Sequence, residues 1–99
     1  AYEREHFGSA AGYHATVSEI SLTMYTHADA YKKIPAPGDL PPTRQAGQYP
    51  WPLSARELRC LFPDGRIGSL PQLANAEHGR RIFDIVVDAI CQNYFGCAS

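Results

Sequence analysis

Ninety-nine residues are enough for one small domain, and a hydrophobic content of 44% is ordinary for a folded chain. Nine basic residues nearly balance ten acidic ones without forming a long run, which argues against a nucleic-acid-binding surface or a polybasic membrane anchor. The apolar run Ile85-Val86-Val87 lies between two aspartates and is far too short to cross a membrane.

The cysteines and the N-terminus bear on the compartment. Cys60, Cys91 and Cys97 lack the spacing of a metal finger, and their odd number without a visible signal peptide favours free thiols. We therefore expect a reducing, cytoplasmic compartment, with a Cys91–Cys97 disulfide as the less favoured alternative. The chain begins at Ala1, which leaves open a processed precursor, a truncated piece or a clipped terminus.

Residues 1–33 combine a polar lead-in with one amphipathic segment. Thr16 and Glu19 have the spacing of a capping box, which marks a helix start. Spacings of three and four then place one stripe on a helix: Val17, Ile20, Met24, His27 and Tyr31. Lys32 and Lys33 would suit its C-terminus. We predict a helix here, with a strand as the rival because Ile20, Leu22 and Met24 also alternate.

Residues 34–74 form a Pro/Gly-rich segment that holds all eight prolines of the chain. Long regular elements are therefore not expected. Ser54 and Glu57 have the spacing of a second capping box and predict one short helix, and Pro63-Asp64-Gly65 predicts a turn. The aromatic run Tyr49-Pro50-Trp51-Pro52 favours a functional or subunit-contacting loop over plain disorder.

Residues 75–96 predict the final helix. Asn75 is a good N-cap, Glu77 lies in the first turn, and Gly96 suits the end. Arg80 and Asp84 are spaced as an ion pair. A broad apolar face predicts a mostly buried helix; it consists of Ile82, Phe83, Ile85, Val86, Val87, Ala89, Ile90 and Tyr94.

No segment indicates a core strand, so two helices and a loop would bury little apolar surface. Ordering each residue costs roughly 1.5 kcal/mol of conformational entropy, which such a chain would hardly offset. We therefore expect the whole chain, residues 1–99, to be one segment that completes a larger body. Its helices would pack on a sheet made elsewhere, either by an N-terminal part of the same domain or by a partner chain.

Two motifs resemble the C-terminal part of the creatininase (creatinine amidohydrolase) family. His14 to Ser21 is similar to that family's His-(Gly/Ala)-Gly-x-x-Glu-Thr-Ser motif, which opens a helix. Gly65 to Gly79 is similar to its Gly-x-x-Gly turn followed by Ala-x-x-Glu-x-Gly at the final helix. The resemblance implies a three-layer α/β/α fold, of which this chain supplies the C-terminal helices and a loop. It also implies a two-metal site of zinc or manganese, compact oligomers, and hydrolysis of a C–N bond in cyclic or linear amides.

Carried over by position, His14 matches the motif histidine, which handles substrate and protons beside the metals. Glu19 matches the glutamate and Ser21 the closing serine. The family's metal ligands lie mainly upstream, so the resemblance places none firmly in this chain, Glu19 being the doubtful case. Thr16 stands where a glycine is usual and Ile20 where a threonine is usual, and these departures bear on substrate handling.

Each candidate also has a structural interpretation. Glu19 could serve only the capping box, and His14 could be a hydrogen-bonding loop residue. Ser21 and Trp51 are candidates for the substrate pocket, although Trp51 could equally fill an apolar gap or an interface. His78 is expected to be structural.

Two functions follow. In the first, the chain is part of a metal-dependent amidohydrolase in which a metal-bound hydroxide attacks a small-molecule amide while His14 delivers a proton to the leaving nitrogen. In the second, the altered motif leaves a non-catalytic binding or scaffolding subunit. A homo- or hetero-oligomer is expected in both cases.

Overall fold

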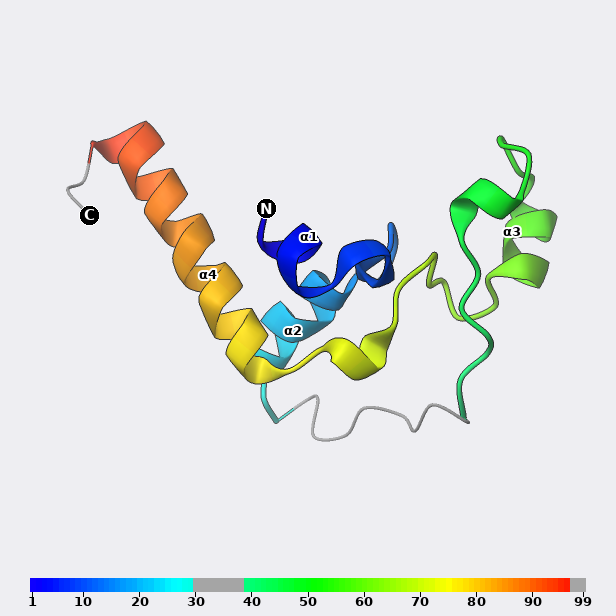
Figure 1. The fold of residues 1–99 in the computed structure, drawn as a ribbon, viewed down its shortest axis with the longest axis horizontal. Helices are drawn as coiled ribbons and strands as arrows, with labels where there is room; N and C mark the ends of the chain where they lie inside the picture. Colours follow the sequence, from blue (N-terminus) through cyan, green and yellow to red (C-terminus); the bar gives the residue numbers. More distant parts are fainter. Residues whose placement is uncertain (30–38, 97–99) are drawn as a thin grey trace.

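The computed structural model describes residues 1–29 and 39–96, and regular structure there is helical (Figure 1). The α-helices are α1 (Tyr2–His6), α2 (Val17–Thr26), α3 (Ala55–Leu61) and α4 (Ala76–Ile90). Short 3-10 turns lie between them: η1 (Gly8–Ala11), η3 (Ala46–Gln48) and η4 (Pro71–Leu73). Cys91–Phe95 (η5) continues α4 as a π-helical turn. Across these two ranges no strand forms, and the β pairing seen is a single antiparallel bridge between His14 and Ile67.

Helix α2 starts as its sequence predicts but ends earlier. The Thr16 hydroxyl accepts a hydrogen bond from the Glu19 amide at 3.1 Å, and the Glu19 carboxylate accepts from the Thr16 amide at 2.9 Å. The helix stops at Thr26, and His27 caps it. The hydroxyls of Thr23 and Thr26 donate to backbone carbonyls four residues back. Such side-chain hydrogen bonds compete with those of the helical backbone and slightly destabilise the helix. The predicted extension to Lys33 was therefore wrong at His27, and residues 30–33 lie outside the described range.

Helix α4 keeps the predicted ends. The Asn75 side chain accepts from the His78 amide at 2.7 Å, and Gly96 caps the π-helical turn with a left-handed backbone. Arg80 bridges one turn forward to Asp84 at 3.0 Å and one turn back to Glu77 at 2.6 Å. The capping box of α3 is confirmed too, with Ser54 and Glu57 bonded reciprocally.

The core lies where α2 crosses the first turns of α4. Gly79 faces the α2 backbone so closely that an added Cβ would sit 1.9 Å from the Ser21 carbonyl oxygen. Ser21 is fully buried, and its hydroxyl accepts from the Asn75 amide at 3.2 Å, which ties α2 to the start of α4. The buried apolar side chains around this crossing are Phe7, Ala11, Val17, Ala74 and Ile82.

The expectation of a mostly buried α4 was wrong for the described parts of the chain. Ile82 and Gly79 are its buried residues, whereas Ile85, Val86 and Ile90 are 51%, 46% and 45% exposed. Figure 1 shows the reason, because α4 extends well past α2 toward the C-terminus and nothing described covers its far half. The apolar face that the sequence predicts is real, but the chain leaves it bare.

The cysteines also differ from expectation. Cys60 is a free, exposed thiol, but Cys91 is disulfide-bonded, so the expectation of three free thiols was wrong. Cys97 lies outside the described residues. With Cys91 oxidised, the cysteines no longer favour a reducing compartment. None of the described helices is long and apolar enough to cross a membrane.

Candidate functional site

The backbone on both sides of His14 is fixed by a short antiparallel pairing. The Tyr13 amide donates to the Ile67 carbonyl at 2.7 Å, and the Ile67 amide donates to the His14 carbonyl at 3.2 Å. Gly12 makes this approach possible. Its φ is +82°, and a Cβ there would lie 2.5 Å from the Ser69 amide nitrogen. The loop backbone is thus held in place while the His14 side chain stays exposed.

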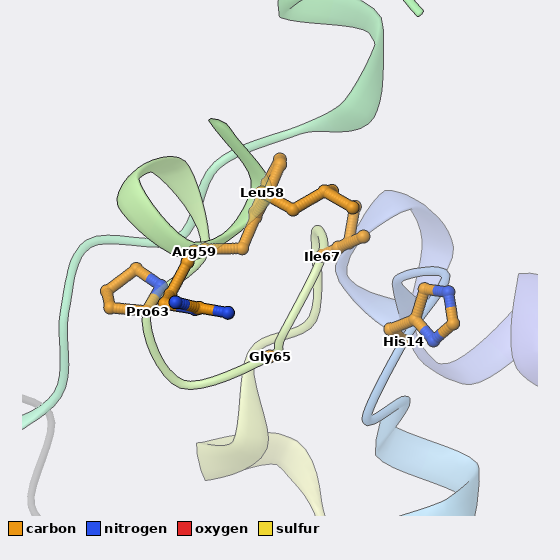
Figure 2. Close-up of a pocket in the computed structure, with 7 residues that line it drawn as sticks. His14, Leu58, Arg59, Pro63, Gly65 and Ile67 are labelled. Carbon is orange, nitrogen blue, oxygen red and sulfur yellow. The ribbon is translucent and has the colours of Figure 1, made fainter. Parts of the chain in front are cut away.

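His14 lines a cavity of about 360 Å³ between the motif loop and α3. The lining consists of His14, Leu58, Arg59, Phe62, Pro63, Gly65 and Ile67. In Figure 2 the His14 ring stands on one side of Gly65 and Ile67, and the side chain of Arg59 stands on the other. The volume suits a small molecule, and the walls are mostly apolar with two basic groups.

A buried arginine holds the wall that carries Ile67. Arg66 is 7% exposed, and its guanidinium donates to Asp64 Oδ2 at 2.6 Å, to the Pro41 carbonyl at 2.7 Å and to the Ser69 carbonyl at 2.9 Å. Burial raises the pKa of Asp64, but the hydrogen bonds and the charge of Arg66 outweigh it, so this pKa lies below its usual value. The ion pair holds Arg66 within the turn, and its bond to the Pro41 carbonyl joins that turn to the segment before η3.

In the described part of the chain, the side-chain hydrogen bonds of Glu19 go to Thr16 rather than to His14. Besides the two backbone contacts of the capping box, Glu19 Oε2 accepts from the Thr16 hydroxyl at 3.2 Å. Thr16, which stands where the family motif has glycine, therefore uses its side chain as a helix cap. An orienting role of Glu19 toward His14 stays a prediction.

Ser21 and Trp51 lie away from the cavity wall. Ser21 is enclosed at the α2–α4 crossing. The Trp51 indole donates to the Ala46 carbonyl at 2.7 Å and stacks on Phe62 with ring centroids 6.3 Å apart. Phe62 lines the cavity, so Trp51 contacts a lining residue without itself being among them. The Trp51 side chain is 46% exposed. Their assignment to the substrate pocket stays a prediction.

The side chains do not bring together a complete metal site in the described ranges 1–29 and 39–96. No group of three or more histidine, cysteine, aspartate or glutamate side chains there is placed to hold an ion. His14, the motif histidine, contributes one exposed imidazole. These residues therefore do not fit a two-metal centre by themselves.

Sequence reasoning missed two features of this region. Arg59 lies on the cavity wall because the capped helix α3 places Leu58 and Arg59 on the same side as the turn at Pro63, which a pattern search alone does not show. The second is a cluster at the start of α4. The Tyr2 hydroxyl lies 2.6 Å from His78 Nδ1, and the rings of His6 and His78 are 5.3 Å apart.

Burial lowers the pKa of His78, and the nearby charges of His6 and Arg81 lower it further, against a smaller opposite effect of Glu77. His78 was expected to be structural, and its contacts show which element it attaches. Its ring packs edge-on against Phe7, with ring centroids 4.8 Å apart, and fixes α1 to α4.

Comparison with known proteins finds one family model whose match includes both motifs. The family model described as "Creatininase: Creatinine amidohydrolase" matches residues 1–94. A comparison with curated proteins gives no match.

Proposed function

The chain belongs to the creatininase family, and on that premise we propose that it is part of a metal-dependent amidohydrolase cleaving a C–N bond of a small cyclic or linear amide. Family membership supports a hydrolase of the amidohydrolase type. The proposal is assigned to this site because His14, the motif histidine, lines a cavity, and the backbone on both sides of it is held by hydrogen bonds.

The role we propose for His14 is proton transfer. Hydrolysis adds water to the amide carbonyl, breaks the C–N bond and requires a proton on the departing nitrogen. An imidazole can take and give a proton near neutral pH, and a group in this role typically contributes about 10²–10⁴-fold in rate. The exposed ring of His14 has room to reach a substrate in the cavity, while the paired backbone limits its movement.

The proposed zinc or manganese would be bound by residues outside this chain, since the described residues form no ligand set. We assign no step at the metal to the residues of this chain. They would bind the substrate and move a proton beside it.

The bare face of α4 supports the structural half of the proposal. Ile85, Val86 and Ile90 are about half exposed, and Tyr94 and Phe95, in the η5 turn that continues α4, are 79% and 76% exposed. We propose that this face packs on a sheet supplied by an N-terminal part of the same domain or by a partner chain, completing a three-layer α/β/α body. Continuous apolar faces of this kind usually mark such contacts. Expressed alone, the chain should aggregate or lack cooperative unfolding, whereas one cooperative transition of a monomer would contradict this.

The test of the catalytic proposal is His14→Ala in the intact protein, with His27→Ala as the control. Both histidines are exposed, but His27 lies at the end of α2 outside the His14 cavity. We expect His14→Ala to lower turnover of an amide substrate by about 10²–10⁴-fold. After dialysis against a weak chelator it should keep its metal, and His27→Ala should match the wild type. Loss of metal would make His14 a ligand, and unchanged activity would leave it without a catalytic role.

A non-catalytic binding or scaffolding subunit is the second candidate. It is favoured by the side-chain hydrogen bonds of Glu19, which within the described residues go to Thr16, one of the positions where the motif departs from the family pattern. An intact assembly that binds metal but hydrolyses no amide would support this alternative.

A further inference from the structure

Among the described residues that line the His14 cavity, the basic groups have no acidic counterpart. His14 and Arg59 are its charged or titratable residues, and the other five lining residues are apolar or glycine. Figure 2 shows the Arg59 side chain beside Pro63, opposite the His14 ring. A pocket lined in this way attracts negative charge.

The nearby carboxylates are already engaged. Asp64, beside the lining residues Pro63 and Gly65, is bonded to the buried Arg66 through both its oxygens. Glu57, on α3 itself, accepts from the Ser54 amide in the capping box. No ion pair of Arg59 is found within the portions of the chain that the structure describes. Its guanidinium is therefore available to a ligand.

The apolar walls restrict what that ligand can be. Leu58, Phe62 and Ile67 surround the cavity, and Phe62 is held by Trp51 and by an edge-on contact with Tyr49 at 5.8 Å. Such walls bind the apolar part of a small molecule, and a few polar groups then set its orientation. A guanidinium suits a carboxylate because it can donate two parallel hydrogen bonds.

We propose that Arg59 is a specificity-determining residue that binds a carboxylate on the substrate, so that this site accepts amides carrying an apolar group and a negative charge. As a statement about substrate, this rests on the proposed amidohydrolase function. Arg59 holds the carboxylate at one side of the cavity, and the apolar walls direct the amide toward His14.

The binding test uses two probes of similar shape, phenylacetate and the neutral ketone phenylacetone, which has no amide bond, titrated calorimetrically into the intact protein. Hydrogen bonds to a charged group imply that the wild type binds phenylacetate about 10- to 100-fold more tightly. Arg59→Gln should abolish this preference, and Arg59→Lys should keep part of it. Arg56→Gln is the matched control, because Arg56 lies on the same helix but not in the cavity lining.

Trp51 reports whether the probe occupies this cavity. Its stacking on Phe62 should make its fluorescence respond to phenylacetate, and Trp51→Phe should remove that response. In turnover assays, Arg59→Gln should raise KM for a carboxylate-bearing amide by a larger factor than it lowers kcat, and by a larger factor than it changes KM for the neutral analogue. Arg56→Gln, outside the cavity lining, should leave both substrates unaffected.

The outcomes separate the two proposals. Equal affinity of the wild type for the two probes, or a preference that survives Arg59→Gln, would overturn the carboxylate site even if amides are hydrolysed. A preference lost in Arg59→Gln but kept in Arg56→Gln would support the carboxylate site. If such a protein, loaded with metal, hydrolysed no amide, the proposed function would fail while the anion site remained.

Discussion

The two halves of the molecule are held together in different ways. At the α2–α4 crossing, Gly79 lets one helix backbone touch the other at Ser21, and apolar side chains close around the contact. In the region from residue 39 to η4, the chain has little apolar core, and Arg66 connects the segment at Pro41 to the turn from Asp64 to Ser69 through charged hydrogen bonds. The first half depends on close packing, the second on one buried guanidinium.

This difference explains how the cavity can be both open and ordered. Close packing would fill the space that a substrate needs. Arg66 instead holds its neighbouring backbone segments through hydrogen bonds of its long side chain, and the cavity between Ile67 and α3 stays unfilled. The tightly packed half then provides the base from which His14 extends.

The largest effect is expected where packing is tightest. Gly79→Ala would place a Cβ against the Ser21 carbonyl and the Tyr25 Cβ, atoms that belong to the facing helix. We expect the free energy of unfolding of the intact protein to fall by about 3 kcal/mol or more. Gly47→Ala is the control, since no atom of the described residues lies within 4 Å of its Cβ position, and it should stay within about 0.5 kcal/mol. Equal denaturant midpoints for the two variants would rule out the close crossing.

The second effect should be confined to the cavity half. Arg66→Met removes the charged bonds to Asp64, Pro41 and Ser69, and should lower the unfolding free energy by about 2–3 kcal/mol. Hydrogen exchange should show lost protection at the Ile67 and Gly68 amides, with α4 unaffected. The exposed Arg81, which pairs with Glu77, serves as the control; Arg81→Met should cost less than about 1 kcal/mol. Uniform loss of protection across both halves would contradict the division.

The contrast also separates what the sequence could predict from what it could not. Helix starts follow from local chemistry, so the capping residues Thr16, Ser54 and Asn75 were predicted correctly. The apolar face of α4 was visible as well, but its burial depends on surfaces that the sequence does not supply. The role of Arg66 was not predicted, because a single charged residue with partners 23 and 25 positions away has no periodic pattern.

The candidate site also has one part that the sequence predicts and one part that it does not. The motif around His14 was recognised along the sequence, and the family match supports it. Arg59 and Phe62 join it through the pairing of His14 with Ile67, residues more than forty positions apart, and through the turn that follows α3. Long-range contacts of this kind leave no local trace in composition or spacing.

Two substitutions at the start of α2, with smaller effects on stability, should show whether Glu19 only caps the helix or also contributes to catalysis. Thr16→Val removes the hydroxyl that accepts from the Glu19 amide and should cost about 1 kcal/mol. Glu19→Gln should change stability by less than about 0.5 kcal/mol, because glutamine also completes a capping box. If Glu19 acts on His14 or on the metal site, Glu19→Gln will still lower turnover. Full activity in that variant would leave Glu19 with its structural role alone.

The smallest effect concerns the attachment of α1, where the histidines make packing depend on pH. The pKa of His78 is lowered by burial first and then by His6 and Arg81, with Glu77 opposing, and the position near the N-terminus of α4 also disfavours a cation. Above the usual histidine value of about 6.5, His78 is neutral whether packed or free, so packing gains nothing from titration. As the pH falls below that value, the detached imidazole takes a proton more readily than the packed one, and the attachment weakens until the pH passes the lowered pKa.

The measurement is amide protection in α1 between about pH 7.5 and 5.5, the range in which histidines titrate. Protection of the amides of Glu5 and Phe7, which donate to Ala1 and Glu3 carbonyls, should fall on acidification. His78→Gln keeps a neutral polar side chain, so its α1 protection should be nearly independent of pH. His6→Gln should reduce the pH dependence without removing it, since burial of His78 remains. If wild-type protection is constant over the range, the Tyr2–His78 contact tolerates the charged ring, with the imidazolium donating to the phenol oxygen. The coupling between His78 titration and the α1–α4 packing would then be wrong.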